Sequence, residues 1–214
     1  MLELGLKFTL AYAIGSVLGG LVVGWFFGGV DIRRTGSGNA GGTNALRTQG
    51  KRVAFFVMLV DVGKGIVAVL LIPGLSMPGI GIDPLVDRDL VTYAVAFAAI
   101  VGHVYPLWFD FKGGKGGATA AGLLLVLAPL FAPIVIGAWI AIVAATGFVG
   151  LATMSATVVA AVLLAIFRLP EDHALVVFTL LVAVLIVFTH RSNIKRMLNG
   201  TESRFGKHVD RKST

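Results

Sequence analysis

Residues 116–167 read GGATAAGLLLVLAPLFAPIVIGAWIAIVAATGFVGLATMSATVVAAVLLAIF and contain no charged side chain. A helix needs about 20 apolar residues, within a range of about 17–25, to cross a lipid bilayer. The run is therefore far too long for a single crossing. Breaks are expected near Pro129 and Pro133 and within 147–150, because proline and glycine interrupt helices. The run predicts three short membrane spans, at about 116–131, 133–147 and 153–168.

The rest of the chain has the same character, with further apolar stretches at about 5–28, 53–73, 90–108 and 174–190. Hydrophobic residues make up 57% of the chain and charged residues only 14%, whereas an ordinary soluble domain carries roughly 25% charged residues. We therefore expect an all-α membrane protein, a polytopic bundle of seven transmembrane helices in a single domain, 1–214. The alternative is five spans, with part of 116–167 re-entrant.

The basic residues are distributed unevenly between the connections. Of the 18 lysines and arginines, 14 follow the first, third or last span. They are Arg33, Arg34, Arg47, Lys51, Arg52, Lys112, Lys115, Arg191, Lys195, Arg196, Arg204, Lys207, Arg211 and Lys212. The opposite connections are acidic, with Glu3, Asp83, Asp87, Asp89, Glu171 and Asp172. Because lysine and arginine are enriched in cytoplasmic loops, we expect the N-terminus outside and the C-terminus in the cytoplasm.

The connection after the first span reads TGSGNAGGTNALR over residues 35–47. Glycines let a backbone turn its N–H groups toward an anion, and an arginine can bind phosphate oxygens in a bidentate manner. A flexible linker is the alternative, but a linker does not need two asparagines and an arginine. The segment predicts a phosphate site formed by Ser37, Asn39, Thr43, Asn44 and Arg47.

The connection after the third span reads FKGGKGGAT over residues 111–119. Glycine N–H groups, two ammonium groups and the start of the next helix all favour an anion. An ordinary basic anchor would need the lysines but not the four glycines. We therefore expect phosphate contacts from Lys112, Lys115, Gly113, Gly114, Gly116 and Gly117.

The basic tail begins with His190 and Asn193, which are three residues apart and so share a helix face. A histidine can exchange a proton near neutral pH. A basic signal that ends a span explains the neighbouring arginines but not this pair.

Asp61 and Lys64, inside the second span, favour a structural ion pair, because buried charges need partners. A supporting role beneath the site is the alternative for this pair. His103, at the end of the third span, favours a structural role, with a direct role at the site as the alternative.

These polar segments are all expected at the cytoplasmic membrane surface. A site there can take a water-soluble phosphate from one side and an acyl chain from between the helices. The chain has no cysteine, which excludes thiol catalysis and disulfides. It also lacks the basic, aromatic-studded surface that binds nucleic acid. A transporter of a small phosphorylated metabolite and a structural membrane subunit are the alternative functions.

Four motifs occur in order: GSGNAGGTNALR at 36–47, GHxxP from 102, FKGGKG from 111 and HRxNIxRxxxGxE from 190. Together they resemble the bacterial membrane acyl-phosphate:glycerol-3-phosphate acyltransferases. The resemblance implies seven spans with a cytoplasmic active site. It also implies transfer of a fatty acyl group from acyl phosphate to the first hydroxyl of glycerol 3-phosphate. The products are lysophosphatidic acid and phosphate, at the start of phospholipid synthesis in the bacterial inner membrane.

On this basis we assign Ser37, Arg47, Lys115, His190 and Asn193 to glycerol 3-phosphate and its reacting hydroxyl. Asn39, Thr43, Asn44 and the 113–117 backbone are assigned to the acyl phosphate. The family has serines near the turn before the sixth span, where this chain offers only Thr153 or Ser155. The base is either His190 or the phosphate of the donor. We expect a monomer that needs no metal and no cofactor.

Overall fold

A computed structural model describes residues 1–169 and 171–206, and every regular element within them is helical. Lys207, Arg211 and Lys212, assigned above to the basic tail, lie outside the described residues. The elements are α1 Leu2–Gly15, α2 Gly19–Phe26, η1 Ile32–Arg34, α3 Gly42–Thr48, α4 Lys51–Leu71, α5 Arg88–Val104, η2 Leu107–Phe109, α6 Gly117–Leu127, α7 Ala132–Thr146, α8 Val149–Arg168, α9 His173–Thr189 and α10 Arg191–Leu198.

Three of these helical segments are long and apolar enough to cross a membrane: α4, α5 continued through η2, and α8. The pairs α1–α2 and α9–α10 also pass when each bent pair counts as one span, which brings the number to five in the described part of the chain. The shorter apolar helices α6 and α7 occupy the first two predicted segments of the run 116–167. The all-helical membrane fold is thus confirmed, and seven crossings stay a prediction.

The first predicted span, 5–28, is not one continuous helix, which corrects the sequence analysis. Helix α1 ends at Gly15, α2 begins at Gly19, and the two axes differ by 42°. The glycines after the break allow close packing: a side-chain carbon on Gly19 would lie 2.7 Å from the Val57 carbonyl oxygen. The apolar pattern continues through the break, so composition alone gave no sign of it.

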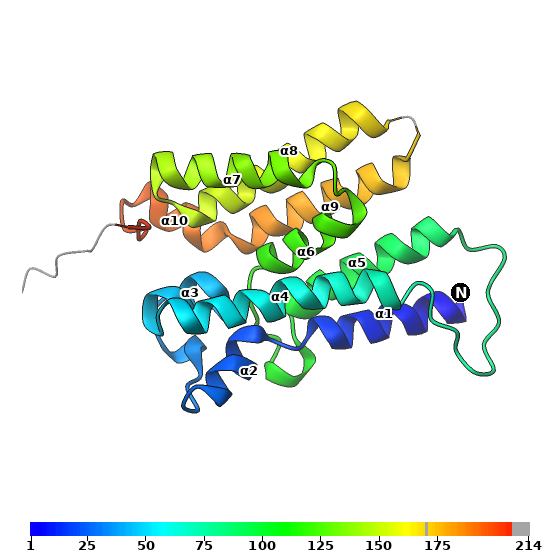
Figure 1. The fold of residues 1–214 in the computed structure, drawn as a ribbon, viewed down its shortest axis with the longest axis horizontal. Coiled ribbons are helices and arrows are strands. Elements are labelled where there is room, and N and C mark those ends of the chain that lie inside the picture. Colours follow the sequence, from blue (N-terminus) through cyan, green and yellow to red (C-terminus); the bar gives the residue numbers. More distant parts are fainter. Residues whose placement is uncertain (170, 207–214) are drawn as a thin grey trace, which may run out of the picture.

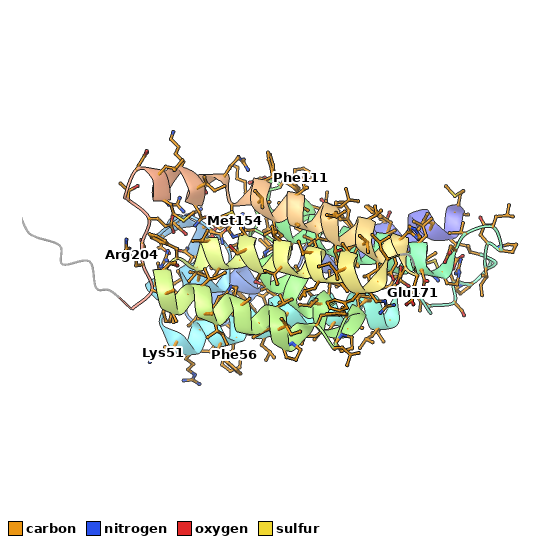
Figure 2. The ribbon with its side chains drawn as sticks, turned by 90° about the horizontal axis from the view of Figure 1, so that it is seen from above. Lys51, Phe56, Phe111, Met154, Glu171 and Arg204 are labelled. Carbon is orange, nitrogen blue, oxygen red and sulfur yellow. The ribbon has the colours of Figure 1, made fainter. Side chains whose placement is uncertain are left out.

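The helices form two groups (Figure 1). In one group α1 packs against α5 and α4 against α6; in the other α8 packs between α7 and α9. Contacts between α5 and α9 join the two groups. Within the first group, α6 lies on the side that faces the second group (Figure 1). Lys51 and Arg204 lie at one end of the bundle, whereas Glu171 lies toward the other (Figure 2).

Helix α4 shows which kinds of residue face the interior of the bundle and which face lipid. Its buried face carries Val57, Asp61 and Lys64, while large apolar residues such as Phe55 and Leu70 are exposed. A soluble protein would not leave so many large apolar side chains in water. The polar residues therefore face the interior of the bundle and the apolar ones face outward, as a bilayer requires.

Helices α1 and α5 cross at two glycines. A side-chain carbon on Gly15 would collide with the Ala99 carbonyl, and one on Gly102 with the Tyr12 carbonyl. Both obstacles are backbone atoms, which cannot swing away as a flexible side chain could. The crossing therefore fixes the distance between the first span and the third.

We expect Gly102→Ala to lower the free energy of unfolding by about 1–3 kcal/mol, because the added methyl forces two backbones apart. The readout is the melting temperature of the detergent-purified protein. Gly137→Ala in α7 is the matched control, because a carbon added there meets no atom within 4 Å. Equal melting temperatures for the two variants would contradict the close crossing.

Candidate active site

A cavity of about 670 Å³ lies between the two groups of helices. Three of the motifs meet here: the first motif at 36–47, the second at 111–119 and the third from His190 to Glu202. Their polar side chains line one part of the cavity, here called the polar end: Ser37, Asn39, Thr43, Arg47, Lys115, His190, Asn193, Arg196 and Glu202. These residues are far apart in the sequence, and the fold brings them together. The remaining lining is mostly apolar.

Asn44 organises the first motif. Its amide nitrogen donates to the carbonyl oxygens of Ile32 at 2.8 Å, Thr35 at 3.0 Å and Asn39 at 3.0 Å. Its amide oxygen accepts from the Ser37 N–H at 2.9 Å. The side chain is buried and both of its amide protons are used. Although Asn44 lines the cavity, its contacts are those of a residue that shapes the loop.

Arg47 projects from the short helix α3 into the polar end. Its Nη2 donates to the Ser203 carbonyl oxygen at 3.0 Å, so the returning C-terminal segment holds one side of the guanidinium. A guanidinium carries five N–H donors. The remaining donors of Arg47 can still bind an anion.

The second motif divides into two halves. The N–H of Gly113 donates to the Val104 carbonyl at 3.1 Å and that of Gly114 to the His103 carbonyl at 3.0 Å. These N–H groups fasten the loop, and within the described part of the chain Lys112, Gly113 and Gly114 do not line the cavity. This differs from the phosphate contacts predicted for all four glycines and both lysines.

The second half of the motif, 115–117, does line the cavity. Gly116 has φ +86°, a left-handed conformation that favours glycine, and it caps the start of α6. The first N–H groups of a helix have no partner within the helix and carry partial positive charge. The beginning of α6 is therefore suited to an anion in the cavity.

Lys115 is held in place by the third motif. Its ammonium donates to the Asn193 amide oxygen and lies 3.5 Å from Ser192 Oγ. Asn193 Nδ2 donates to Glu202 Oε1 at 3.1 Å. The other Glu202 oxygen accepts from Arg196 Nε at 2.7 Å. This chain of contacts links the glycine loop, α10 and the C-terminal segment into one polar wall.

His190 lies where α9 meets α10, at a bend of 51°. The ring is buried, and its Nδ1 lies 2.7 Å from the Ile186 carbonyl oxygen. A carbonyl can only accept a hydrogen bond, so Nδ1 carries the proton. The lone pair then belongs to Nε2. His190 is therefore prepared to accept a proton or a hydrogen bond from a hydroxyl in the cavity.

Lys115 is partly buried and has other basic side chains near it. Partial burial lowers the pKa of Lys115 to about 8, and the charges of Arg196, Arg47 and Arg191 act in the same direction. Glu202 opposes them but does not outweigh them. The ammonium is therefore charged below about pH 8 and increasingly neutral above it.

Asp61, Lys64 and His103 form a buried cluster next to the cavity. Lys64 Nζ lies 3.1 Å from Asp61 Oδ1, as their spacing predicted, and 2.7 Å from His103 Nδ1. The same ammonium donates to the carbonyls of Gly15 at 2.9 Å and Val17 at 2.7 Å. Asp61 and His103 also line the cavity. The cluster therefore connects the break in the first span with the wall of the site.

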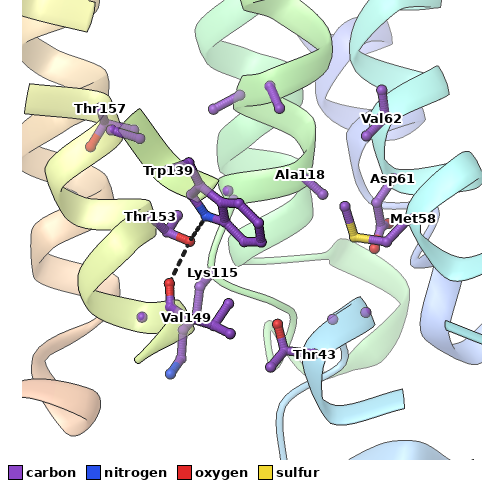
Figure 3. Close-up of a pocket in the computed structure, with 18 of the residues that line it drawn as sticks. Thr43, Met58, Asp61, Val62, Lys115, Ala118, Trp139, Val149, Thr153 and Thr157 are labelled. Carbon is purple, nitrogen blue, oxygen red and sulfur yellow. Dashed lines mark hydrogen bonds between the residues drawn. The ribbon is translucent and has the colours of Figure 1, made fainter. Parts of the chain in front are cut away.

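Thr153, the residue in place of the family serines, lines the cavity (Figure 3). Its hydroxyl donates to the Val149 carbonyl at 2.9 Å and accepts from Trp139 Nε1 at 3.1 Å (Figure 3). Ser155, also among the described residues, does not line the cavity. Thr153 therefore has the better position, although contact with a phosphate requires its hydroxyl to turn away from Val149.

Among the lining residues to which the sequence analysis gave no role are Trp139, Arg196 and Glu202. Arg196 was explained as part of a basic signal, which hid its second role. Glu202 belongs to the motif that begins at His190 and is the one acid within residues 190–202, and this contrast could have drawn attention to it. Trp139 lies in an uncharged run without a polar motif.

Among the described residues, no group of three or more histidine, aspartate or glutamate side chains could hold a metal ion.

The family model for glycerol-3-phosphate acyltransferase matches residues 6–200. The chain belongs to the glycerol-3-phosphate acyltransferase family. It is 37% identical to the enzyme of that name from Chlorobium limicola, over 97% of this chain and 100% of that protein. It is 42% identical to the one from Neisseria meningitidis serogroup C, over 92% and 95% of the respective chains.

Solved structures agree with this family membership. The fold is similar to the crystal structure of PlsY (YgiH), an integral membrane glycerol 3-phosphate acyltransferase, in its glycerol 3-phosphate form. The TM-score is 0.79 and the identity 34%, over 95% of this chain and 96% of the other. The lysophosphatidic acid form of PlsY matches with a TM-score of 0.78 and the same identity.

The position of Lys115 predicts a pH-dependent affinity for glycerol 3-phosphate. The phosphate of the ligand has its second pKa near 6, so its charge stays constant above pH 7. As the pH rises through about 8, Lys115 loses its charge. We expect Kd to rise about ten-fold between pH 7 and pH 9, as measured by calorimetric titration.

Lys115→Arg is the matched control, because a guanidinium keeps its charge throughout this range. Its affinity should stay nearly constant with pH. A pH-independent Kd in the unsubstituted protein would exclude Lys115 as a charged ligand of the phosphate.

Proposed function

We propose that this protein transfers a fatty acyl group from acyl phosphate to the first hydroxyl of glycerol 3-phosphate. The hydroxyl oxygen bonds to the acyl carbonyl carbon, and the bond between that carbon and the phosphate oxygen breaks. The products are lysophosphatidic acid and inorganic phosphate. The reaction opens phospholipid synthesis, and the acyl donor is neither a thioester of coenzyme A nor one of acyl carrier protein.

One observation carries the proposal: a single cavity joins a cationic polar end to an apolar groove. The apolar groove is lined by Leu123, Leu124, Leu127, Val135, Thr157, Ala160, Leu164, Leu175, Phe178 and Val182. A substrate with a phosphate at one end and a fatty chain behind it matches this division. A purely water-soluble substrate would leave the groove without an occupant.

The polar end must hold two anions that repel each other. Arg47 and Lys115 together supply the charge that offsets this repulsion, and Ser37 adds a hydroxyl donor beside them. We assign these three to glycerol 3-phosphate. Asn39, Thr43 and the N–H groups at the start of α6 are assigned to the acyl phosphate. Placing both substrates in one cavity aligns the hydroxyl with the carbonyl, which is a large part of catalysis between two reactants.

The proton of the attacking hydroxyl goes to His190 Nε2 or to an oxygen of the donor phosphate. The Ile186 contact orients the His190 ring with its lone pair on Nε2, which supports His190 as the acceptor. Charge then develops on the carbonyl oxygen and on the departing phosphate. Donors that are already in place, such as the N–H groups at the start of α6, stabilise that charge without further reorganisation.

We further propose seven membrane crossings, with α6 and α7 as short spans in addition to the five longer ones. The N-terminus is outside and the C-terminus is cytoplasmic in the bacterial inner membrane. The enrichment of basic residues in cytoplasmic loops supports this orientation, as does the position of Lys51 and Arg204 at one end of the bundle (Figure 2). The polar end is then open to cytoplasmic glycerol 3-phosphate, and one chain supplies the whole site as a monomer.

Transport of a phosphorylated metabolite is the less suitable alternative. A transporter concentrates polar groups near the bilayer midplane. In this cavity the ionic groups of all three motifs lie at one end, and the apolar groove offers a phosphate no counter-charge.

The decisive experiment mixes the purified protein with a synthetic acyl phosphate and glycerol 3-phosphate. We expect release of one phosphate for each lysophosphatidic acid formed. Hydrolysis of the donor without acylated product, or no turnover in lipid conditions that preserve the fold, would disprove the proposed activity. Flux of glycerol 3-phosphate into vesicles without turnover would favour the transporter.

Arg47→Ala tests the cationic clamp. We expect kcat/KM for glycerol 3-phosphate to fall about 10²–10³-fold, because a group that stabilises charge is lost from the site. Arg52→Ala is the matched control: Arg52 follows on the adjacent helix α4 and lies 5.5 Å from the Phe27 ring centre. Its activity should remain, and both variants should keep the melting temperature of the parent. Wild-type rates for Arg47→Ala would remove Arg47 from the mechanism.

A further inference from the structure

We propose that Leu164, with Leu175 and Phe178, forms an end wall that sets the longest acyl chain this enzyme uses efficiently. The inference rests on the proposed function, because it concerns the chain of the acyl donor. It adds the residues that determine specificity along the apolar groove.

Helix α8 shows where the groove ends. On the face that lines the cavity, its side chains remain small through Gly150, Thr153, Thr157 and Ala160. Successive positions on this face are three or four residues apart, as the helical repeat requires. The next residue on the same face is Leu164, which is fully buried. From Gly150 onward the residues on this face stay small, and the first large one, Leu164, closes the groove.

Helix α6 changes in the same direction. Close to the polar end it lines the cavity with Gly117, Ala120 and Ala121, and further away with Leu124 and Leu127. Both helices therefore leave most room near the reacting groups and least room at the far end. The same gradient on two separate helices indicates a groove of defined depth.

The far end is closed by well-packed side chains. Leu164 and Leu175 have exposed fractions of 0% and 1%, and Phe178 of 6%. The Phe178 ring stacks on Tyr93 with 5.6 Å between the ring centres. Tyr93 in turn donates to Asp172 Oδ2 at 2.8 Å. This support from α5 limits how far the wall can yield to a longer chain.

The hydroxyls in the groove do not make it polar. Thr157 donates to the Met154 carbonyl at 2.8 Å, and Thr179 to the carbonyls of Leu175 and Val176. Thr153 donates to Val149 and accepts from Trp139 (Figure 3). With their protons given to the backbone, these threonines leave a predominantly apolar surface for methylene groups.

The length of the groove matches a common membrane acyl chain. Gly150 packs against Asn193 at the polar end, and the helical rise places Leu164 about 21 Å further along α8. The same rise separates Leu175 from His190 by about 22 Å on α9. An extended chain advances about 1.2 Å per bond, which gives space for about 17 carbons. One leaflet of the bilayer core, about 15 Å thick, holds chains of similar length.

Ala160→Leu moves the wall one helical turn, about 5.4 Å, toward the polar end. The usable chain should then shorten by about four methylenes. We expect kcat/KM to fall about four-fold for each methylene that no longer fits. Donors of eight to ten carbons, which end before position 160, should react at parental rates and thereby show that the site is intact. Val162→Leu, on the exposed side of the same turn, is the matched control.

Leu164→Ala gives the opposite change and covers the case in which Ala160→Leu does not fold. Removing the wall should raise kcat/KM for donors of 20 carbons relative to 16 carbons by at least about four-fold, the value of one added methylene. Ile166→Ala is its control, because Ile166 lies on the exposed side of α8 and the substitution removes the same number of atoms.

Both variants are measured with a series of saturated acyl phosphates from 8 to 20 carbons. Opposite shifts of the chain-length profile, with unchanged profiles in the two controls, support the end wall. Parental profiles in Ala160→Leu and Leu164→Ala overturn it while leaving the acyltransferase function in place. An unsubstituted enzyme that transfers no acyl group of any length removes the proposed function, and the inference with it.

Discussion

The structure depends on the interactions that stabilise the break between α1 and α2 inside the membrane. Lipid offers no hydrogen bonds, so the backbone groups released by the break between α1 and α2 need partners from the protein. Lys64 supplies them by donating to the carbonyls of Gly15 and Val17. Asp61 balances its charge and accepts from the N–H of Gly19 at 3.0 Å. The costly pair of buried charges thus permits the first span to turn, and the turn directs the chain toward the loop that builds the site.

The same division between support and chemistry recurs in the loops. Asn44 is buried and gives its amide protons to backbone carbonyls, while Gly113 and Gly114 use their N–H groups on α5. Such residues hold Ser37 and Lys115 at the cavity without needing to touch a substrate. A catalytic loop with many glycines would otherwise have too much conformational freedom, because glycine loses the most entropy on folding. Fixing the loop before substrate arrives reduces the ordering that binding must accomplish.

Sequence alone predicted the helices that depend on length and apolarity, such as α4 and α9, because lipid imposes both directly. It also brought together His190, Lys115 and Arg47 as members of one site, since their chemistry suits the same anion. It did not predict the break after Gly15, because the flanking residues are as apolar as an unbroken span. Nor did it separate residues that face the cavity from those that only fasten a loop: glycines in a row look alike until the partner of each N–H is known. That information comes from contacts between distant segments, which composition does not record.

The basic side chains at the polar end repel one another, and a bound anionic substrate reduces this repulsion. Burial is the main cause of the lowered pKa of Lys115, and the like charges of Arg196 and Arg47 add to it. Each unit of pKa shift corresponds to about 1.4 kcal/mol of difference between the interactions of the charged and the neutral form. A phosphate carries roughly −1.5 to −2 charges, so its arrival relieves the repulsion as well as forming new contacts. Glu202 already offsets part of this positive charge through its ion pair with Arg196. The neighbouring arginines therefore favour a bound anion and contribute, together with burial, to the lowered pKa of Lys115.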